Sequence, residues 1–152
     1  MKIAITGADS RLGRALTANL VEAGHDVRST DIDSVDVLRM EQVIDLCKGM
    51  ERIVHLAGAR RRHESPAAGE DGRILDTALK GSFNVMQAAR QSGVSQVVQV
   101  SDVCIYDGYG EDLILSEDMV PLPDTSAEQQ ALHLAESVAH EFAREAPGSI
   151  LT

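Results

Sequence analysis

The sequence predicts an α/β protein built on a doubly wound parallel sheet with helices on both faces, in three α/β/α layers. Two observations predict this class. Short β-prone runs alternate with longer stretches whose apolar residues fall at helical spacing, and a turn containing glycine follows the first run. The chain has 152 residues, of which 43% are hydrophobic, so we expect one globular domain with its own core.

Five β-prone runs predict the strands: residues 2–6, 25–30, 52–58, 96–101 and 149–152. Four longer stretches predict helices, because their apolar residues recur three and four positions apart. They are residues 12–23, 40–47, 74–92 and 127–144, and glycines follow the first three: Gly24, Gly49 and Gly93. The irregular stretches, residues 60–72 and 107–126, are expected to be loops over the carboxyl edge of the sheet.

Charge and composition argue against several kinds of partner. The formal net charge is −10, so the field of the protein repels phosphate backbones, and nucleic acid is not expected as a partner. Cys47 and Cys104 lack the spacing of a metal or redox motif, so we expect reduced thiols, no metal site and a cytoplasmic location. No apolar stretch is long enough to predict a membrane span or a signal peptide.

The turn after the first strand has the spacing Gly7-x-x-Ser10-x-x-Gly13. Such a turn lets a pyrophosphate approach the amides at a helix N-terminus, as in the dinucleotide site of a Rossmann-type fold. Gly7 is expected to make the tight turn and Gly13 the close packing of helix on strand, with Arg11 and Leu12 between them. Ser10 stands where a middle glycine is expected. Its Cβ restricts φ, but its hydroxyl can donate to a phosphate.

Asp31 ends the second predicted strand, where a carboxylate can accept hydrogen bonds from both ribose hydroxyls of an adenosine. A 2′-phosphate would meet the negative charge there, so the position favours NAD over NADP. The sequence therefore predicts a dinucleotide site for NAD. The alternative is a turn between sheet and helix that holds no ligand.

Four stretches occur in order along the chain: TGADSRLGRAL, RIVHLAGA, ALKGSFNVMQAARQSGVSQVVQVSDVCIYDG and AESVAHEFARE. Together they resemble the extended short-chain dehydrogenase/reductases of the NAD-dependent epimerase/dehydratase type. In that family the turn reads TGxxGxxG, so Ser10 replaces the middle glycine. The strand before Asp36 is unusually short for that family. The resemblance implies further cofactor contacts at five positions: Asp36 and Val37, which would meet the adenine, and Leu56, Ala57 and Gly58, in a segment beside the adenosine and nicotinamide riboses.

The family's chemistry uses an asparagine, a serine or threonine, a tyrosine and a lysine. This chain departs from that tetrad at every aligned position: Ala78, Asp102, Glu128 and Leu132. No lysine follows Lys80, so no shift of the alignment restores a Tyr-x-x-x-Lys pair. Two interpretations remain open. Asp102 and Glu128 are a carboxylate pair that substitutes for the lost groups, or these positions belong to a site no longer used for redox chemistry.

The resemblance leaves two functions of different class. One is an NAD-dependent oxidoreductase or epimerase that acts on a sugar-like hydroxyl, and the other is a non-catalytic NAD-binding module for sensing or assembly. Family members also carry a C-terminal part that forms most of the substrate pocket. The chain stops within its last predicted strand, so we expect residues 1–152 to be a single NAD(P)-binding domain without that part.

Two further expectations concern surfaces. The resemblance implies a homodimer through the helices at 74–92 and 127–144, where Ala131, Ala135 and Ala139 would permit close packing. Three arginines follow the third predicted strand: Arg60, Arg61 and Arg62. They can hold a substrate carboxylate or phosphate, and the alternative is a solvated loop.

Overall fold

The computed structural model describes residues 1–58, 69–110, 114–116, 118–146 and 150–151. Five strands form one sheet in the order β2-β1-β3-β4-β5, and every pair is parallel. The strands are β1 Lys2–Thr6, β2 Asp26–Thr30, β3 Arg52–His55, β4 Gln96–Gln99 and β5 Ile150–Leu151. The chain passes from one side of β1 to the other between β2 and β3. The carboxyl ends of β1 and β3 are therefore the topological switch point, and the predicted parallel sheet is confirmed.

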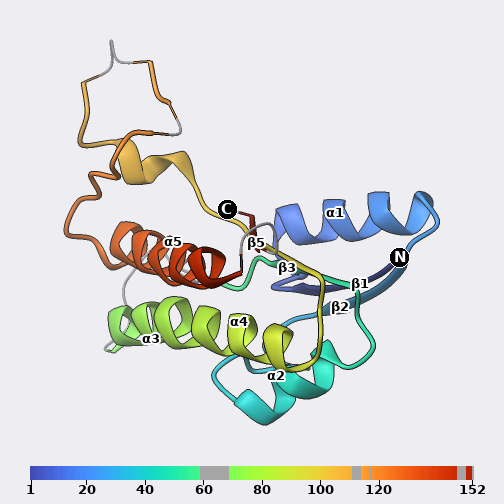
Figure 1. Cartoon of the computed structure of the whole chain (residues 1–152). Coiled ribbons are helices and arrows are strands. Elements are labelled where there is room, and N and C mark those ends of the chain that lie inside the picture. The colour runs from blue at the N-terminus through green and yellow to red at the C-terminus, as the bar shows by residue number, and fades with distance from the viewer. Residues whose placement is uncertain (59–68, 111–113, 117, 147–149, 152) are drawn as a thin grey trace.

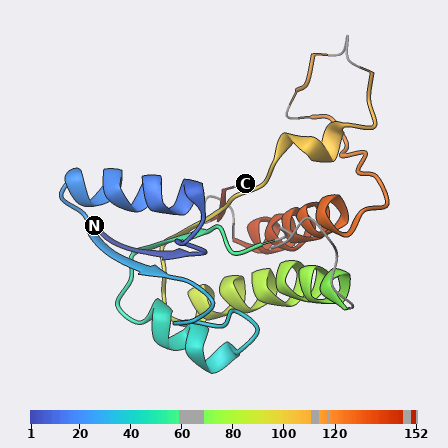
Figure 2. The ribbon, with the colours of Figure 1, turned by 180° about the vertical axis from the view of Figure 1, so that it is seen from behind.

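Helices cover both faces of this sheet. They are α1 Arg11–Glu22, α2 Met40–Cys47, α3 Glu70–Asp76, α4 Ser82–Gln91 and α5 Ala127–Glu145. A π-helical segment, η1 Thr77–Gly81, joins α3 to α4, and a 3-10 helix, η2 Val103–Tyr106, follows β4. α1 lies on one side of the sheet and α2 and α4 lie on the other (Figure 1), as the view from behind also shows (Figure 2). The helix predicted at 74–92 begins earlier, at Glu70, and contains an unpredicted π segment.

The main apolar core lies between the sheet and α2, α4 and α5. Ala4, Ile53 and Val97 form an in-register row across β1, β3 and β4, and each is almost fully buried. The helix residues in the same cluster include Val43, Leu46, Cys47, Val85, Met86 and Ala139. Side chains two residues farther along each strand point to the same face of the sheet. On this face, the positions nearer the carboxyl ends of the strands are polar: Thr6, His55 and Gln99.

The small residues of α5 face the inside of the subunit. Ala131 and Ala139 are fully buried, and Ala135 is 6% exposed. Ala131 and Ala135 belong to a second cluster with Ile74 of α3 and Ala78 of η1. The prediction that this stripe serves packing between two subunits is therefore wrong. Its small side chains instead let α5 pack closely on helices and sheet of the same chain.

Residues 31–39, between β2 and α2, contain no strand, so the short strand expected before Asp36 does not form. Asp31 Oδ1 accepts hydrogen bonds from the amide and hydroxyl of Ser34 (3.1 and 3.0 Å). Asp36 Oδ1 accepts one from the amide of Leu38 (2.9 Å). These local bonds satisfy amides that a strand would pair, which is why short polar side chains favour turns. As a result, nothing in the described part of the chain pairs with the outer side of β2.

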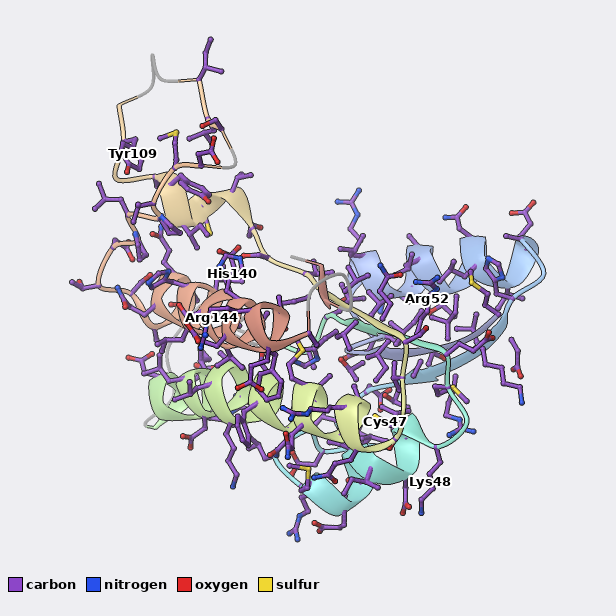
Figure 3. All side chains as sticks on the ribbon, in the orientation of Figure 1. Cys47, Lys48, Arg52, Tyr109, His140 and Arg144 are labelled. Carbon is purple, nitrogen blue, oxygen red and sulfur yellow. The ribbon has the colours of Figure 1, made fainter. Side chains whose placement is uncertain are left out.

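The segment after β4 projects from the body of the domain (Figure 1). Asp102 caps η2 at its base, where Asp102 Oδ1 accepts a hydrogen bond from the amide of Cys104 (3.1 Å). Farther out, the Tyr109 hydroxyl donates to the carbonyl of Val120 (2.9 Å), and Figure 3 shows Tyr109 on this projection. The described residues between 107 and 126 contain no helix or strand, as the sequence predicts.

Candidate functional site

A cleft of about 720 Å³ opens at the carboxyl ends of β1 and β3. This volume lies within the usual range for cofactor sites, and the switch point is where ligands bind in open α/β sheets. The β1–α1 turn, the loop after β2 and residues of α3, η1, α5 and the end of β4 line it. Three predicted contacts line it after β3: Leu56, Ala57 and Gly58.

The β1–α1 turn requires glycine at two positions. Gly7 has φ of +70°, and a Cβ there would lie 2.7 Å from the amide nitrogen of Ala57. A Cβ at Gly13 would lie 2.6 Å from the Cα of Ala8. The Gly7 contact agrees with the tight turn that the sequence predicts, whereas a Cβ at Gly13 would meet Gly7 and Ala8 of the turn itself rather than a strand. Gly7 lines the cleft, whereas Gly13 is buried and is not part of its lining.

Ser10 fits this turn without strain. It has φ of −64° and ψ of 159°, an extended backbone open to any residue. Its Oγ accepts a hydrogen bond from the amide of Gly13 (2.9 Å) and so caps α1, which leaves the hydroxyl proton free to donate. The amides of Arg11 and Leu12, at the positive end of α1, find no acceptor among the described residues. An anion fits here, because both residues and Ser10 line the cleft.

Ser10→Ala is expected to lower the free energy of unfolding by about 1 kcal/mol, because α1 loses its N-cap. Ser126 caps α5 in the same way, through the amide of Gln129, and is not part of the cleft lining, so Ser126→Ala is the matched control. Urea unfolding should show similar losses in both variants. Calorimetric titration with a dinucleotide should show weaker binding in Ser10→Ala alone, and equal binding would mean that the Ser10 hydroxyl does not reach the ligand.

The loop after β2 forms an acidic and apolar wall. Asp31 is half-buried and lines the cleft. Ile32, which is 44% exposed, lies in the same wall with Val35 and Val37. Asp36 does not line this cleft but a second, shallower hollow. Of the two adjacent positions predicted to meet an adenine, the structure therefore brings only Val37 to the cleft.

Three of the four positions aligned with the family's catalytic group lie together in the cleft. Ala78 of η1, Asp102 after β4 and Leu132 of α5 all line it, whereas Glu128 does not. Two of these three side chains are apolar and can neither give nor accept a proton. The proposed pairing of Asp102 with Glu128 remains a prediction.

Sequence reasoning missed several residues that line the cleft: Ile32, Val35, Arg73, Ile74, Thr77, Gln99, Val100 and Ser101. Gln99, Val100 and Ser101 could have been found, because the carboxyl ends of neighbouring parallel strands share one edge. The α3 residues give no such signal. Arg73 pairs with the buried Glu70 at 3.5 Å. The three arginines predicted at the mouth, Arg60 to Arg62, lie outside the described residues.

A row of buried polar side chains crosses the sheet at this end. Thr6 of β1, His55 of β3 and Gln99 of β4 are in register, and each is at most 4% exposed. Thr6 Oγ1 lies 2.7 Å from His55 Nδ1. Burial lowers the pKa of His55 to about 4, so the ring is neutral at pH 7. The sequence does not predict this row, because each of its residues lies in a separate run that is typical of an ordinary strand.

Within the described ranges, no group of three or more His, Cys, Asp or Glu side chains is placed to hold a metal ion. In the same part of the chain, no helix has the length and apolar character needed to cross a membrane. Cys47 and Cys104 are unpaired thiols, and burial raises the pKa of both to about 11. Neither thiol is therefore ionised at neutral pH.

A model of the NAD dependent epimerase/dehydratase family matches residues 3–150. One similar curated protein is a 3-beta-hydroxysteroid dehydrogenase of Mycolicibacterium neoaurum, 24% identical over 135 residues, which cover 79% of this chain and 37% of that protein. An uncharacterised protein of Mycobacterium tuberculosis is 28% identical over 113 residues, which cover 66% of this chain and 12% of that protein. The chain thus spans well under half the length of these relatives.

Solved structures share the fold. A short-chain dehydrogenase/reductase superfamily protein from Agrobacterium tumefaciens with bound NAD is 25% identical, with a TM-score of 0.81 over 96% of this chain and 46% of that one. The UDP-glucuronic acid 4-epimerase of Bacillus cereus, in complex with UDP-glucuronic acid and NAD, is 18% identical. Its TM-score is 0.82 over 99% of this chain and 55% of that one. The second likeness, at this low identity, concerns the fold alone.

Proposed function

This chain belongs to the NAD dependent epimerase/dehydratase family, and from that premise we propose that its cleft binds NAD(H). One observation carries the proposal, the turn from Gly7 to Gly13. Neither glycine leaves room for a Cβ, and the amides of Arg11 and Leu12 are available at the start of α1. A pyrophosphate binds at such a helix N-terminus. The similar protein from Agrobacterium tumefaciens holds NAD.

Asp31 supports a preference for NAD over NADP. Its Oδ1 is bonded to Ser34, which leaves Oδ2 for the ribose hydroxyls of the adenosine. A 2′-phosphate would meet the charge of this carboxylate. Ile32, Val35 and Val37 supply apolar surface for an adenine in the same wall.

We assign the chain to the dinucleotide-binding part of an oxidoreductase or epimerase that acts on a sugar-like hydroxyl. NAD, when bound, would accept the hydride from the carbon that carries this hydroxyl. Asp102, in the cleft wall, is this chain's own candidate to accept the hydroxyl proton. Glu128, the carboxylate predicted to pair with it, lies outside the lining. The match to the NAD dependent epimerase/dehydratase family supports this class of reaction.

A non-catalytic NAD-binding module for sensing or assembly is the second candidate. Leu132 favours it, because this apolar side chain lines the cleft where the family's lysine would stand. Loss of a general acid/base usually costs about 10²–10⁴ in rate. Incubation with NAD⁺ and a panel of sugars, uronates and nucleotide sugars separates the candidates. NADH absorbance, or conversion of a sugar to its epimer detected by NMR, that Asp102→Asn abolishes would support the enzyme, and neither signal across the panel would support the module.

Calorimetric titration with NAD⁺, NADH and NADP⁺ tests the cofactor assignment. We expect saturable binding of NAD(H) and weaker binding of NADP⁺. Asp31→Asn keeps the oxygen that accepts from Ser34 but removes the charge, so it should weaken NAD⁺ binding by about tenfold and narrow the preference over NADP⁺. Asp33→Asn, an exposed neighbour outside the lining, is the matched control. No binding at millimolar NAD(H) would overturn the proposal.

A homodimer through α4 and α5 is the assembly we propose. Leu79 of η1 and Phe83 of α4 are each 47% exposed, and the Phe83 ring packs edge-on against Phe142 of α5, with centroids 5.7 Å apart. Sedimentation at micromolar concentration should show a dimer for the wild type and a monomer for Phe83→Glu. Val21→Glu, at an exposed apolar residue of α1, should remain dimeric. A monomeric wild type would contradict the assignment.

The charge of the chain and the state of its cysteines support the remaining proposals on ligands and cellular location. We propose a dinucleotide and a sugar-like small molecule as ligands, and the net charge of −10 argues against nucleic acid. A cytoplasmic location is supported by the two unpaired cysteines, since disulfides are rare in reducing compartments.

A further inference from the structure

The buried polar row contains a chain of hydrogen bonds that ends at the cleft wall. The amide of Ala57 donates to Thr6 Oγ1 at 3.4 Å, and Thr6 Oγ1 lies 2.7 Å from His55 Nδ1. Thr6 directly precedes Gly7, whose missing Cβ lets the turn approach that same Ala57 amide. This chain of hydrogen bonds therefore joins the β1–α1 turn to the loop after β3, and the two loops form the cleft at the switch point.

The direction of this chain follows from the available donors. Thr6 Oγ1 accepts from the Ala57 amide, and its own proton has one neighbour able to receive it, His55 Nδ1, within the described part. The alternative, in which Nδ1 donates to Thr6, would leave a buried hydroxyl proton without an acceptor, which is costly. In the arrangement that gives both the Ala57 amide and the Thr6 hydroxyl a partner, Nδ1 is the acceptor and the ring proton of His55 sits on Nε2.

The far nitrogen of the ring, His55 Nε2, is buried among other polar residues of the fold. Gln99 is in register with His55 on β4, and Ser82 is a buried residue at the start of α4. His55 Nε2, Gln99 Oε1 and Ser82 Oγ are all buried and lack partners among the described residues. Gln99 Oε1, on the neighbouring strand, is therefore a candidate acceptor for the Nε2 proton.

We propose that His55 is a positioning residue of the dinucleotide site. As a neutral ring protonated on Nε2, it accepts the Thr6 hydroxyl proton, holds that oxygen toward the Ala57 amide and so fixes the wall against which Gly7 packs. An apolar side chain of similar size would fill the space but leave the Thr6 proton without an acceptor. This inference rests on NAD(H) binding as the function of the cleft.

The first test uses the cofactor-free protein. Nitrogen-15 NMR of the histidine rings at pH 7 should show His55 neutral and protonated on Nε2. Hydrogen exchange at the Ala57 amide should become about tenfold faster in the isosteric Thr6→Val and stay at the wild-type rate in Thr6→Ser, which keeps the hydroxyl. A ring protonated on Nδ1, or unchanged exchange in Thr6→Val, would overturn the proposal.

The second test is titration with NAD⁺. His55→Asn keeps an acceptor near the place of Nδ1 and should bind within about threefold of the wild type, whereas His55→Leu should bind about tenfold more weakly. Thr6→Val should lower NAD⁺ affinity as much as His55→Leu does. The double variant should bind no more weakly than either single variant, because both substitutions break the same chain of hydrogen bonds. His140→Leu, at an exposed histidine of α5, is the control.

The outcomes separate two kinds of failure. Additive losses in the double variant, or equal weakness of His55→Asn and His55→Leu, would overturn the role of His55. If His55→Leu does not fold, Thr6→Val carries the same prediction. A wild type that does not bind NAD(H) would overturn the proposed function, while the tautomer and the exchange of the Ala57 amide still decide whether His55 fixes this wall.

Discussion

Replacing Gly7 by alanine is expected to lower the free energy of unfolding by several kcal/mol and to abolish NAD(H) binding. Two costs combine. A non-glycine residue at φ of +70° loses about 1–2 kcal/mol. The new Cβ would also lie 2.7 Å from the Ala57 nitrogen and 2.8 Å from the Leu56 carbonyl carbon, and such overpacking costs about 1–3 kcal/mol more. Because the displaced backbone is the cleft wall, the ligand loses its contacts as well.

Gly24→Ala separates these two costs. Gly24 also has a positive φ, +81°, but no atom lies within 4 Å of a Cβ placed there. This variant should lose only the conformational part in urea unfolding and should bind NAD(H) like the wild type. Equal losses in the two variants would mean that the close approach of the turn to β3 contributes nothing to stability.

The second large effect is a fall in stability between about pH 6.5 and pH 4. Burial lowers the pKa of His55 from 6.5 to about 4, so in this interval the unfolded chain binds a proton that the folded chain excludes. The free energy of unfolding therefore rises with pH through the window, and the contribution of His55 is constant above it. At 1.36 kcal/mol per pKa unit, the full effect is about 3 kcal/mol.

Urea unfolding at a series of pH values between about 7.5 and 4.5 measures this effect. His55→Asn removes the titrating ring, so its stability should fall less steeply than that of the wild type on acidification. Carboxylates titrate in both proteins, and the difference between the two curves isolates His55. His140→Gln should follow the wild type, because His140 is exposed. Parallel curves for the wild type and His55→Asn would show that the folded protein protonates this ring freely.

Those parts of the fold and site that depend on neighbours in sequence could be predicted. The β1–α1 turn is one, because a tight turn with positive φ at Gly7 needs glycine whatever surrounds it. Asp31 is another, because the carboxyl ends of parallel strands meet at one edge. The family followed from motifs that occur in order along the chain.

The parts that depend on contacts between distant segments could not be predicted. Thr6, His55 and Gln99 stand in three separate runs, and only the register of three strands makes them a row. The α5 alanines pack inward on α3, η1 and the main core, which lie far from α5 in the sequence. Gly72 lies inside α3, and glycine ordinarily indicates a helix break. The sequence therefore predicts a loop where the first turn of α3 forms.

The missing strand between β2 and α2 has a consequence for aggregation. It leaves β2 at an edge of the sheet, and unpaired backbone groups at an edge can recruit a strand from another chain. This edge is protected, because β2 is short and exposes Asp26 and Arg28. Arg28 Nη1 also donates to the carbonyls of Asp45 (3.4 Å) and Leu46 (3.2 Å), which ties the last turn of α2 to the edge strand. The charged side chains of β2 and the tie from Arg28 to α2 therefore keep the sheet from growing between molecules.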